Sequence, residues 1–321
     1  MCESLFNFSV YYKIHIFYII VLCKCQGKLK NLSITIEKNV ILWYKLAIEV
    51  KAIKDKRLKM EKNIDIYNKI ENCNIKSKIF FEDSNKKKDK IFIFCHGFCS
   101  GKGSNSVKIV SNMLLEYGIP SISFDFPGHI DSVQGTDKLN VDVCISYINS
   151  VIEYVKENFG SDIKISFYAI SFGAYILLNK LIGDISYYDN IVLRSPAFNM
   201  KDILVKSLLK ESFEQYKKNG KSRAGHGGKI EVPYSFYEDL ANHNLYNDYK
   251  EKRKILILQG EQDDTAPIED TYRFIQNKPE IELIKIKNVK HHMEPQEISQ
   301  STEMMLKRLN IKSWHKLVKM V

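Results

Sequence analysis

The chain has 321 residues, of which 45% are hydrophobic, 27% charged and 12% aromatic, with 15 glycines and 7 prolines. This composition excludes a disordered tail, a collagen-like repeat and a disulfide-bonded scaffold, and the length permits one large domain or two small ones. The net charge is +10, but the lysines are spread along the chain and no arginine-rich helix or nucleic-acid motif occurs. We therefore expect no nucleic-acid partner.

The seven cysteines form no pattern of a metal site or of a disulfide framework. Cys23 and Cys25 lie close together, as do Cys95 and Cys99, but no second pair with histidines at zinc-finger spacing accompanies them. We expect free thiols in a reducing compartment, no bound metal, and a cytoplasmic protein.

The first 59 residues differ in character from the rest of the chain. Residues 5–23 are mostly apolar, but Lys13 and His15 interrupt the run, and a membrane-spanning helix needs about 20 apolar residues. Two interpretations stay open: a membrane tether with lysines on its inner side, or an N-terminal extension that is dispensable for the chemistry. We favour the extension, because the recognisable fold begins at Met60.

From Met60 onward, strand and helix patterns alternate. Residues 64–67 and 78–81 predict an opening hairpin around a polar turn. Apolar runs predict buried strands at 91–95, 119–125, 163–170, 191–193, 255–258 and 281–286. Apolar spacing predicts helices at 106–117, 143–155, 172–181, 268–276 and from Pro295. The alternation predicts an α/β fold, with a mostly parallel sheet and helices on both faces.

Residues 197–250 interrupt this alternation and are expected to form a small helical lid over the carboxyl ends of the strands. They contain an amphipathic helix with apolar residues at 203, 204, 208 and 209, and a second helix at 235–240. Aromatic side chains of this segment either line a pocket for the substrate or pack the lid on the core: Phe213, Tyr216, Tyr234, Phe236 and Tyr237.

Ser171 lies between a predicted strand and a predicted helix. A serine at such a turn has a strained backbone, so the residues two before and two after it must be small. Ala169 and Gly173 meet this need. The turn would raise the Ser171 hydroxyl above the edge of the sheet as a nucleophile; a chance run of small residues around a serine is the alternative.

The segment His96-Gly97-Phe98 ends an earlier predicted strand. Glycine lets the backbone approach a ligand, so the amides of Phe98 and Phe172 would form an oxyanion hole. An ordinary strand-ending turn is the alternative. We interpret His96 as a residue that holds the loop rather than as a base.

Acids and histidines follow the last two predicted strands. An acid at the carboxyl end of a strand can orient an imidazole, and Asp263 is preferred over its neighbour Asp264 for this role. His291 and His292 follow the strand at 281–286, where either can exchange a proton near neutral pH. A solvated acidic turn and a solvated loop histidine are the alternatives for each motif taken alone.

The order Ser171, Asp263, His291 is that of an α/β-hydrolase, and the chain from Met60 to the last helix resembles this superfamily. Within it, the chain is most similar to carboxylesterases and to serine-aminopeptidase-like hydrolases with a lid. The segments that carry the resemblance are 95–98 for the oxyanion motif, 124–132 for the loop after the fourth strand, 194–197 before the lid, and 260–267 for the acid turn.

The resemblance implies a serine hydrolase that cleaves a carboxylic ester or related acyl bond of a small molecule through an acyl-enzyme, without a cofactor. It favours Asp263, which stands three residues after Gly260, and His291, which an apolar residue follows shortly. Aminopeptidase, thioesterase or acyltransferase relatives, and a catalytically silent binding protein, are the alternative functions.

Two positions depart from the family's pattern. Ala169 replaces the first glycine of the serine turn, with little expected effect. Ile130 replaces the second glycine of the loop 124–132 and is expected to alter its path near the active site. Asp125 and His129 in this loop are interpreted as structural residues.

Overall fold

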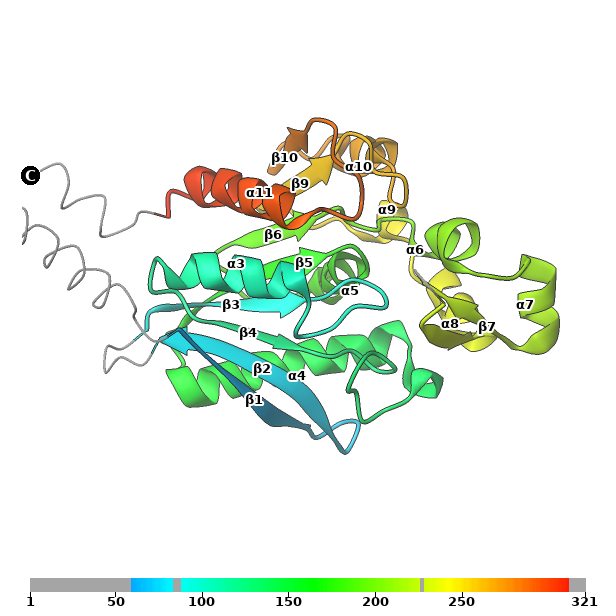
Figure 1. Cartoon of the computed structure of the whole chain (residues 1–321), viewed down its shortest axis with the longest axis horizontal. Helices are drawn as coiled ribbons and strands as arrows, with labels where there is room; N and C mark the ends of the chain where they lie inside the picture. Colours follow the sequence, from blue (N-terminus) through cyan, green and yellow to red (C-terminus); the bar gives the residue numbers. More distant parts are fainter. Residues whose placement is uncertain (1–58, 83–87, 226–227, 312–321) are drawn as a thin grey trace, which may run out of the picture. The chain divides into compact units, whose positions relative to one another are not determined.

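A computed structural model describes residues 59–82, 88–225 and 228–311 of the chain (Figure 1). The predictions of a dispensable N-terminal extension and of membrane contact through residues 5–23 lie outside the described residues. Within those residues, no helix has the length and apolar character that crossing a membrane requires.

Eight strands form one sheet in the order β1-β2-β4-β3-β5-β6-β9-β10. Their bounds are β1 (Lys59–Asn68), β2 (Cys73–Glu82), β3 (Lys90–Cys95), β4 (Ser121–Phe124), β5 (Lys164–Ile170), β6 (Ile191–Arg194), β9 (Ile255–Gly260) and β10 (Ile281–Ile286). Strand β2 pairs antiparallel with β1 and β4, and all pairs from β4 to β10 are parallel. The predicted hairpin and mostly parallel sheet are confirmed.

Both faces of the sheet are covered by helices, as predicted (Figure 1). On one face, α4 (Val141–Phe159) and α5 (Phe172–Leu181) pack on strand residues such as Ile93. On the other, α3 (Asn105–Leu115) and α11 (Pro295–Arg308) pack on the alternate residues, such as Phe92. Burial of both sets explains the continuous apolar runs of the central strands.

Local sequence fixes where these helices begin. The side chains of Ser104 and Asn140 accept the amides of Val107 and Val143, which caps α3 and α4. Helix α11 begins at a proline, and Glu294 before it forms a reciprocal capping pair with Glu297 in its first turn. A further helix, α10 (Ile268–Ile275), lies between β9 and β10, and a short turn, η1 (Thr136–Lys138), precedes α4.

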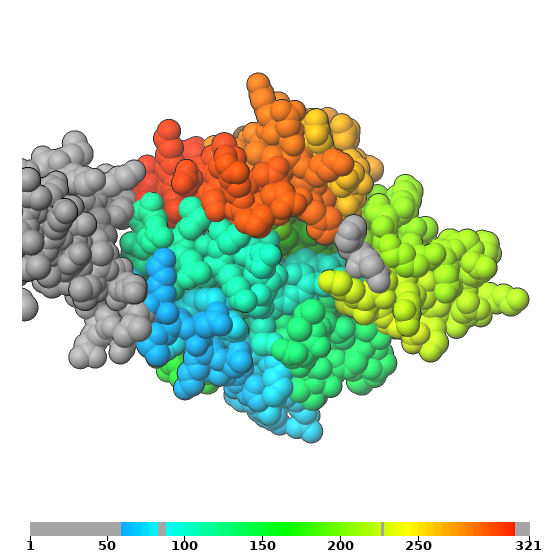
Figure 2. Space-filling model, viewed as in Figure 1, coloured from blue at the N-terminus to red at the C-terminus, as the bar shows by residue number. Residues whose placement is uncertain are grey.

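The segment 197–250, called the insertion below, lies between β6 and β9. Its elements are α6 (Met200–Ile203), η2 (Leu204–Leu208), α7 (Phe213–Asn219), β7 (Lys221–Ala224), β8 (Ile230–Pro233), α8 (Tyr234–Ala241) and α9 (Leu245–Asp248). The sequence predicted the first helical segment and α8, but not α7, α9 or the hairpin of β7 and β8. Figures 1 and 2 show much of the insertion beyond the end of the sheet toward which β3 points.

Candidate active site

Ser171 occupies the turn between β5 and α5. Its backbone has φ 50° and ψ −112°, a conformation that residues with a side chain rarely adopt. At Gly173, in the first turn of α5, only glycine fits, because an added Cβ would lie 2.3 Å from the carbonyl oxygen of Cys95. Ala169 is fully buried, so a residue larger than alanine would meet packed neighbours there. The small residues predicted from the sequence therefore have identifiable steric causes.

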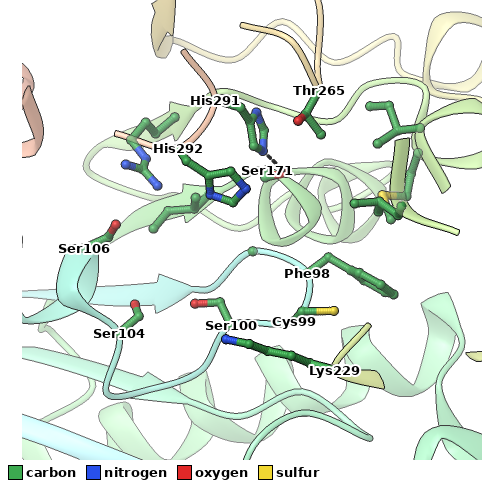
Figure 3. Close-up of a pocket in the computed structure, with 16 residues that line it drawn as sticks. Phe98, Cys99, Ser100, Ser104, Ser106, Ser171, Lys229, Thr265, His291 and His292 are labelled. Atoms are coloured by element: carbon green, nitrogen blue, oxygen red, sulfur yellow. Dashed lines mark hydrogen bonds between the residues drawn. The ribbon is translucent and has the colours of Figure 1, made fainter. Parts of the chain in front are cut away.

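His291 and Asp263 continue from Ser171 as one chain of hydrogen bonds (Figure 3). His291 Nε2 lies 3.0 Å from Ser171 Oγ, and His291 Nδ1 lies 2.9 Å from each carboxylate oxygen of Asp263. An ionised carboxylate only accepts, so Nδ1 carries the imidazole proton and Nε2 can accept the serine proton. The arrangement can therefore make the Ser171 oxygen nucleophilic.

The carboxylate of Asp263 is held by four donors. Besides His291, it accepts the amides of Thr265 at 3.1 Å and Ala266 at 2.8 Å, and the side-chain amide of Gln259 at 3.2 Å. These hydrogen bonds fix the orientation of the carboxylate toward the His291 imidazole.

Asp264 and His292, the alternatives to Asp263 and His291 in the sequence, make different contacts. The Asp264 carboxylate is exposed and lies 3.8 Å from Lys290 Nζ, away from the imidazole of His291. His292 is exposed, and its ring centroid lies 5.6 Å from that of His291. The structure thus brings together Ser171, His291 and Asp263 in one chain of hydrogen bonds.

The two predicted oxyanion donors lie in the loop after β3 and at the start of α5. An added Cβ on Gly97 would lie 3.5 Å from the Ser171 Cβ, which shows how closely the loop after β3 approaches the serine. Phe172 is the first residue of α5, and within the described residues neither its amide nor that of Phe98 donates a hydrogen bond. Unpaired amides beside a serine hydroxyl suit the stabilisation of an oxyanion.

His96 holds the loop that carries Phe98, in agreement with its structural interpretation. The amide of Phe126 donates to His96 Nε2 at 3.0 Å, so Nδ1 carries the proton and donates to the Gly97 carbonyl at 2.8 Å. Burial lowers the pKa of His96 to about 4 and that of His129 to about 3. Both rings are therefore neutral at pH 7 and weak as bases.

Asp125 joins the loop after β3 to the loop after β4. Its fully buried carboxylate accepts the backbone amide and the ammonium of Lys102, each at 2.6 Å. The same ammonium reaches Asp131 at 2.6 Å. Ile130, which replaces a glycine of the family pattern, has φ 43°, so isoleucine here adopts the left-handed conformation that glycine favours.

Ser171 and His291 line a cavity of about 310 Å³. One part of its wall is apolar and comes from the insertion, with Met200, Ile203 and Leu208. The other part is polar and includes Arg194 together with Ser100, Ser104, Ser106, Lys229 and His292, which Figure 3 labels. This volume accommodates a small molecule with both apolar and polar groups.

Cys99 also lines this cavity, but its chemistry differs from that of Ser171. Burial raises the pKa of the Cys99 thiol to about 12, so it carries no thiolate at neutral pH. The four described cysteines are free thiols, as predicted. Within the described parts of the chain, no cluster of three or more histidine, cysteine, aspartate or glutamate side chains could hold a metal ion.

The aromatic side chains of the insertion pack rather than line the cavity. Phe213 and Tyr216 contact Tyr234, and Phe213 also contacts Tyr237. Phe236 stacks on Phe98 at a centroid distance of 6.2 Å and meets Phe172 edge to face. Of the two interpretations given for these residues, the structure agrees with packing.

Sequence comparison and structural comparison give different results. No protein-family model and no curated protein matches the sequence significantly. Solved structures, in contrast, match about four fifths of the chain. Est1E from Butyrivibrio proteoclasticus, solved with ferulic acid bound, has 17% identity and a TM-score of 0.66 over 78% of this chain and 100% of its own.

Two further matches have similar statistics. Mouse α/β-hydrolase domain-containing protein 10 has 18% identity and a TM-score of 0.64 over 78% of this chain and 98% of its own. An α-β serine hydrolase homologue from Coxiella burnetii has 17% identity and a TM-score of 0.53 over 77% and 97%. At these identities the likeness establishes the fold, and the chain has the α/β-hydrolase fold predicted from its sequence.

Proposed function

We propose that this α/β-hydrolase fold carries a serine hydrolase that cleaves a carboxylic ester or related acyl bond of a small molecule. The observation that carries the proposal is the hydrogen-bonded chain from Ser171 through His291 to Asp263, beside two unpaired backbone amides. The likeness to Est1E and to an esterase domain from a Rhodothermus marinus protein, both at low identity, supports the same class of reaction.

The reaction follows from this geometry. His291 Nε2 takes the proton of the Ser171 hydroxyl while the oxygen attacks the substrate carbonyl carbon. The amides of Phe98 and Phe172 donate to the carbonyl oxygen as it becomes negative, and the Asp263 carboxylate stabilises the imidazolium. His291 then protonates the leaving oxygen, which departs as an alcohol and leaves an acyl ester on Ser171.

Water completes the cycle by the reverse sequence of proton transfers. His291 removes a proton from a water molecule, whose oxygen attacks the acyl carbon. The second tetrahedral intermediate collapses as His291 returns the proton to the Ser171 oxygen. The carboxylic acid is released and the enzyme is restored.

The proposal is tested by hydrolysis of 4-nitrophenyl butyrate, together with a thioester and an aminoacyl amide of similar size. We expect Ser171→Ala to reduce turnover to background, and Asp263→Asn to lower kcat by about 10⁴-fold because it favours the wrong imidazole tautomer. Asp264→Asn is the matched control, since this exposed carboxylate lies outside the hydrogen-bonded chain.

The panel also separates the related activities. Preference for the thioester or the amide would move the assignment to that acyl bond without changing the mechanism. Turnover that survives in Ser171→Ala, or equal losses in the two aspartate variants, would contradict the proposed mechanism.

A further inference from the structure

Arg194 is a buried cation beside the serine turn. It ends β6, and its carbonyl accepts the backbone amide of Ser171 at 3.0 Å. The residue is 6% exposed and lines the cavity onto which Ser171 opens. Its Nε and Nη1 atoms are buried without a hydrogen-bond partner within the described residues. A guanidinium in this state normally has an anion beside it.

The carboxylate of Asp263 does not form an ion pair or a hydrogen bond with Arg194. Asp263 is close enough for its charge to act on the guanidinium, but it accepts four hydrogen bonds from other groups. The hydroxyl of Tyr168, on the same face of the sheet, is also buried without a partner. Burial lowers the pKa of Arg194, although a guanidinium stays charged in proteins. Of these two buried groups without a hydrogen-bond partner, Arg194 is the one that lines the cavity.

The rest of the cavity wall also favours a negatively charged ligand. Among its lining residues are Arg194 and Lys229, but no aspartate or glutamate of the described chain. Figure 3 shows the Lys229 side chain extending toward Ser100, across the cavity from His291. The hydroxyl-bearing Ser104 and Ser106 lie at the start of α3, where helix amides also favour anions. A neutral ester would leave these groups without an ionic partner.

We infer that the polar wall is an anion-binding subsite, and that the substrate is an ester bearing a second group, a carboxylate or a phosphate, held by Arg194. The inference rests on the proposed function and specifies its substrate class. The apolar wall of Met200, Ile203 and Leu208 then receives the hydrocarbon part of the same molecule. Arginine suits this role because its guanidinium stays charged and donates hydrogen bonds to either oxyanion.

The first test compares kcat/KM for esters of matched length: methyl hexanoate, monomethyl adipate and methyl 5-phosphonopentanoate. The wild-type protein is expected to prefer at least one anionic ester over the neutral ester by tenfold or more, and the better anion identifies the group. Arg194→Gln is expected to bring this ratio toward one. Arg223→Gln removes an exposed arginine outside the cavity and should preserve the ratio.

A second test uses adipate as a ligand and needs no turnover. Arg194→Met is expected to match or exceed the wild-type melting temperature, because it removes an unpaired buried charge. Adipate at millimolar concentration should raise the melting temperature of the wild type and not that of Arg194→Met. A structural role for Arg194 would instead give a variant that melts lower, with no effect of adipate on the wild type.

The outcomes separate this inference from the proposed function. Ester turnover that depends on Ser171, with no preference for an anionic ester and no response to adipate, overturns the anion subsite alone. Absence of turnover with a response to adipate that depends on Arg194 supports the subsite and rejects the hydrolase.

Discussion

Replacement of His96 by glutamine should have an effect on stability that changes with pH. The imidazole of His96 is 1% exposed and has a pKa of about 4, against an ordinary value of 6.5. A histidine whose pKa is lowered on folding stabilises the folded protein above pH 6.5, and that stabilisation falls as the pH drops toward 4. Each pH unit in this interval removes about 1.4 kcal/mol from the free energy of unfolding.

The magnitude follows from these values. At pH 7.5 we expect His96→Gln to cost about 2 kcal/mol, because the amide of Phe126 and the carbonyl of Gly97 lose a well-placed partner. Between pH 6.5 and pH 5 the wild type loses about 2 kcal/mol through His96 alone, and the variant does not. The two proteins should therefore be nearly equal in stability at pH 5.

The assay is urea denaturation of both proteins at several pH values from 7.5 to 5. His243→Gln is a control of opposite sign, because the carboxylate of Asp239, 3.6 Å from His243 Nε2, raises the pKa of His243. Its stabilising effect is complete below pH 6.5 and is lost as the pH rises, so the cost of that variant should grow on acidification. If the difference in free energy of unfolding between the wild type and His96→Gln stayed constant across this range, burial would not lower the pKa of His96.

Three further substitutions test local features of the site, each by urea denaturation. Gly173→Ala should cost on the order of 1–3 kcal/mol, because its Cβ would lie 2.3 Å from a backbone oxygen; unchanged stability would contradict this close approach. Ile130→Gly should stabilise by up to about 1 kcal/mol, since it relieves a left-handed isoleucine, and a clear loss would show that side-chain packing dominates. Lys102→Met should cost about 3–5 kcal/mol by leaving Asp125 buried without its cation; a loss below 1 kcal/mol would argue against this ion pair.

The parts of the fold that are encoded locally could be predicted from the sequence. Strands buried on both faces appear as apolar runs, and the serine turn carries small residues where the chain has no room for larger ones. The order of Ser171, Asp263 and His291 along parallel strands was enough to expect them at one edge of the sheet.

Features that depend on tertiary contacts could not be predicted in this way. The sequence favoured Asp263 over Asp264 only through the family resemblance, because the structural cause lies in amides of the same turn and in an imidazole 28 residues further along the chain. Helix α7, in contrast, could have been predicted from local sequence. Ser212 is its N-cap, and Gly220 adopts the left-handed conformation after its last residue. That Arg194 is buried without a hydrogen-bond partner could not be predicted from local sequence, because it depends on which acceptors the surrounding strands and loops place near the guanidinium.

Intact-mass analysis after exposure to a fluorophosphonate shows whether Ser171 is an activated nucleophile. We expect a single adduct on the wild type and on Asp264→Asn, a much slower reaction of Asp263→Asn, and no adduct on Ser171→Ala. An adduct of equal yield on Ser171→Ala, or a folded wild type that never reacts with the probe, would contradict this role of Ser171.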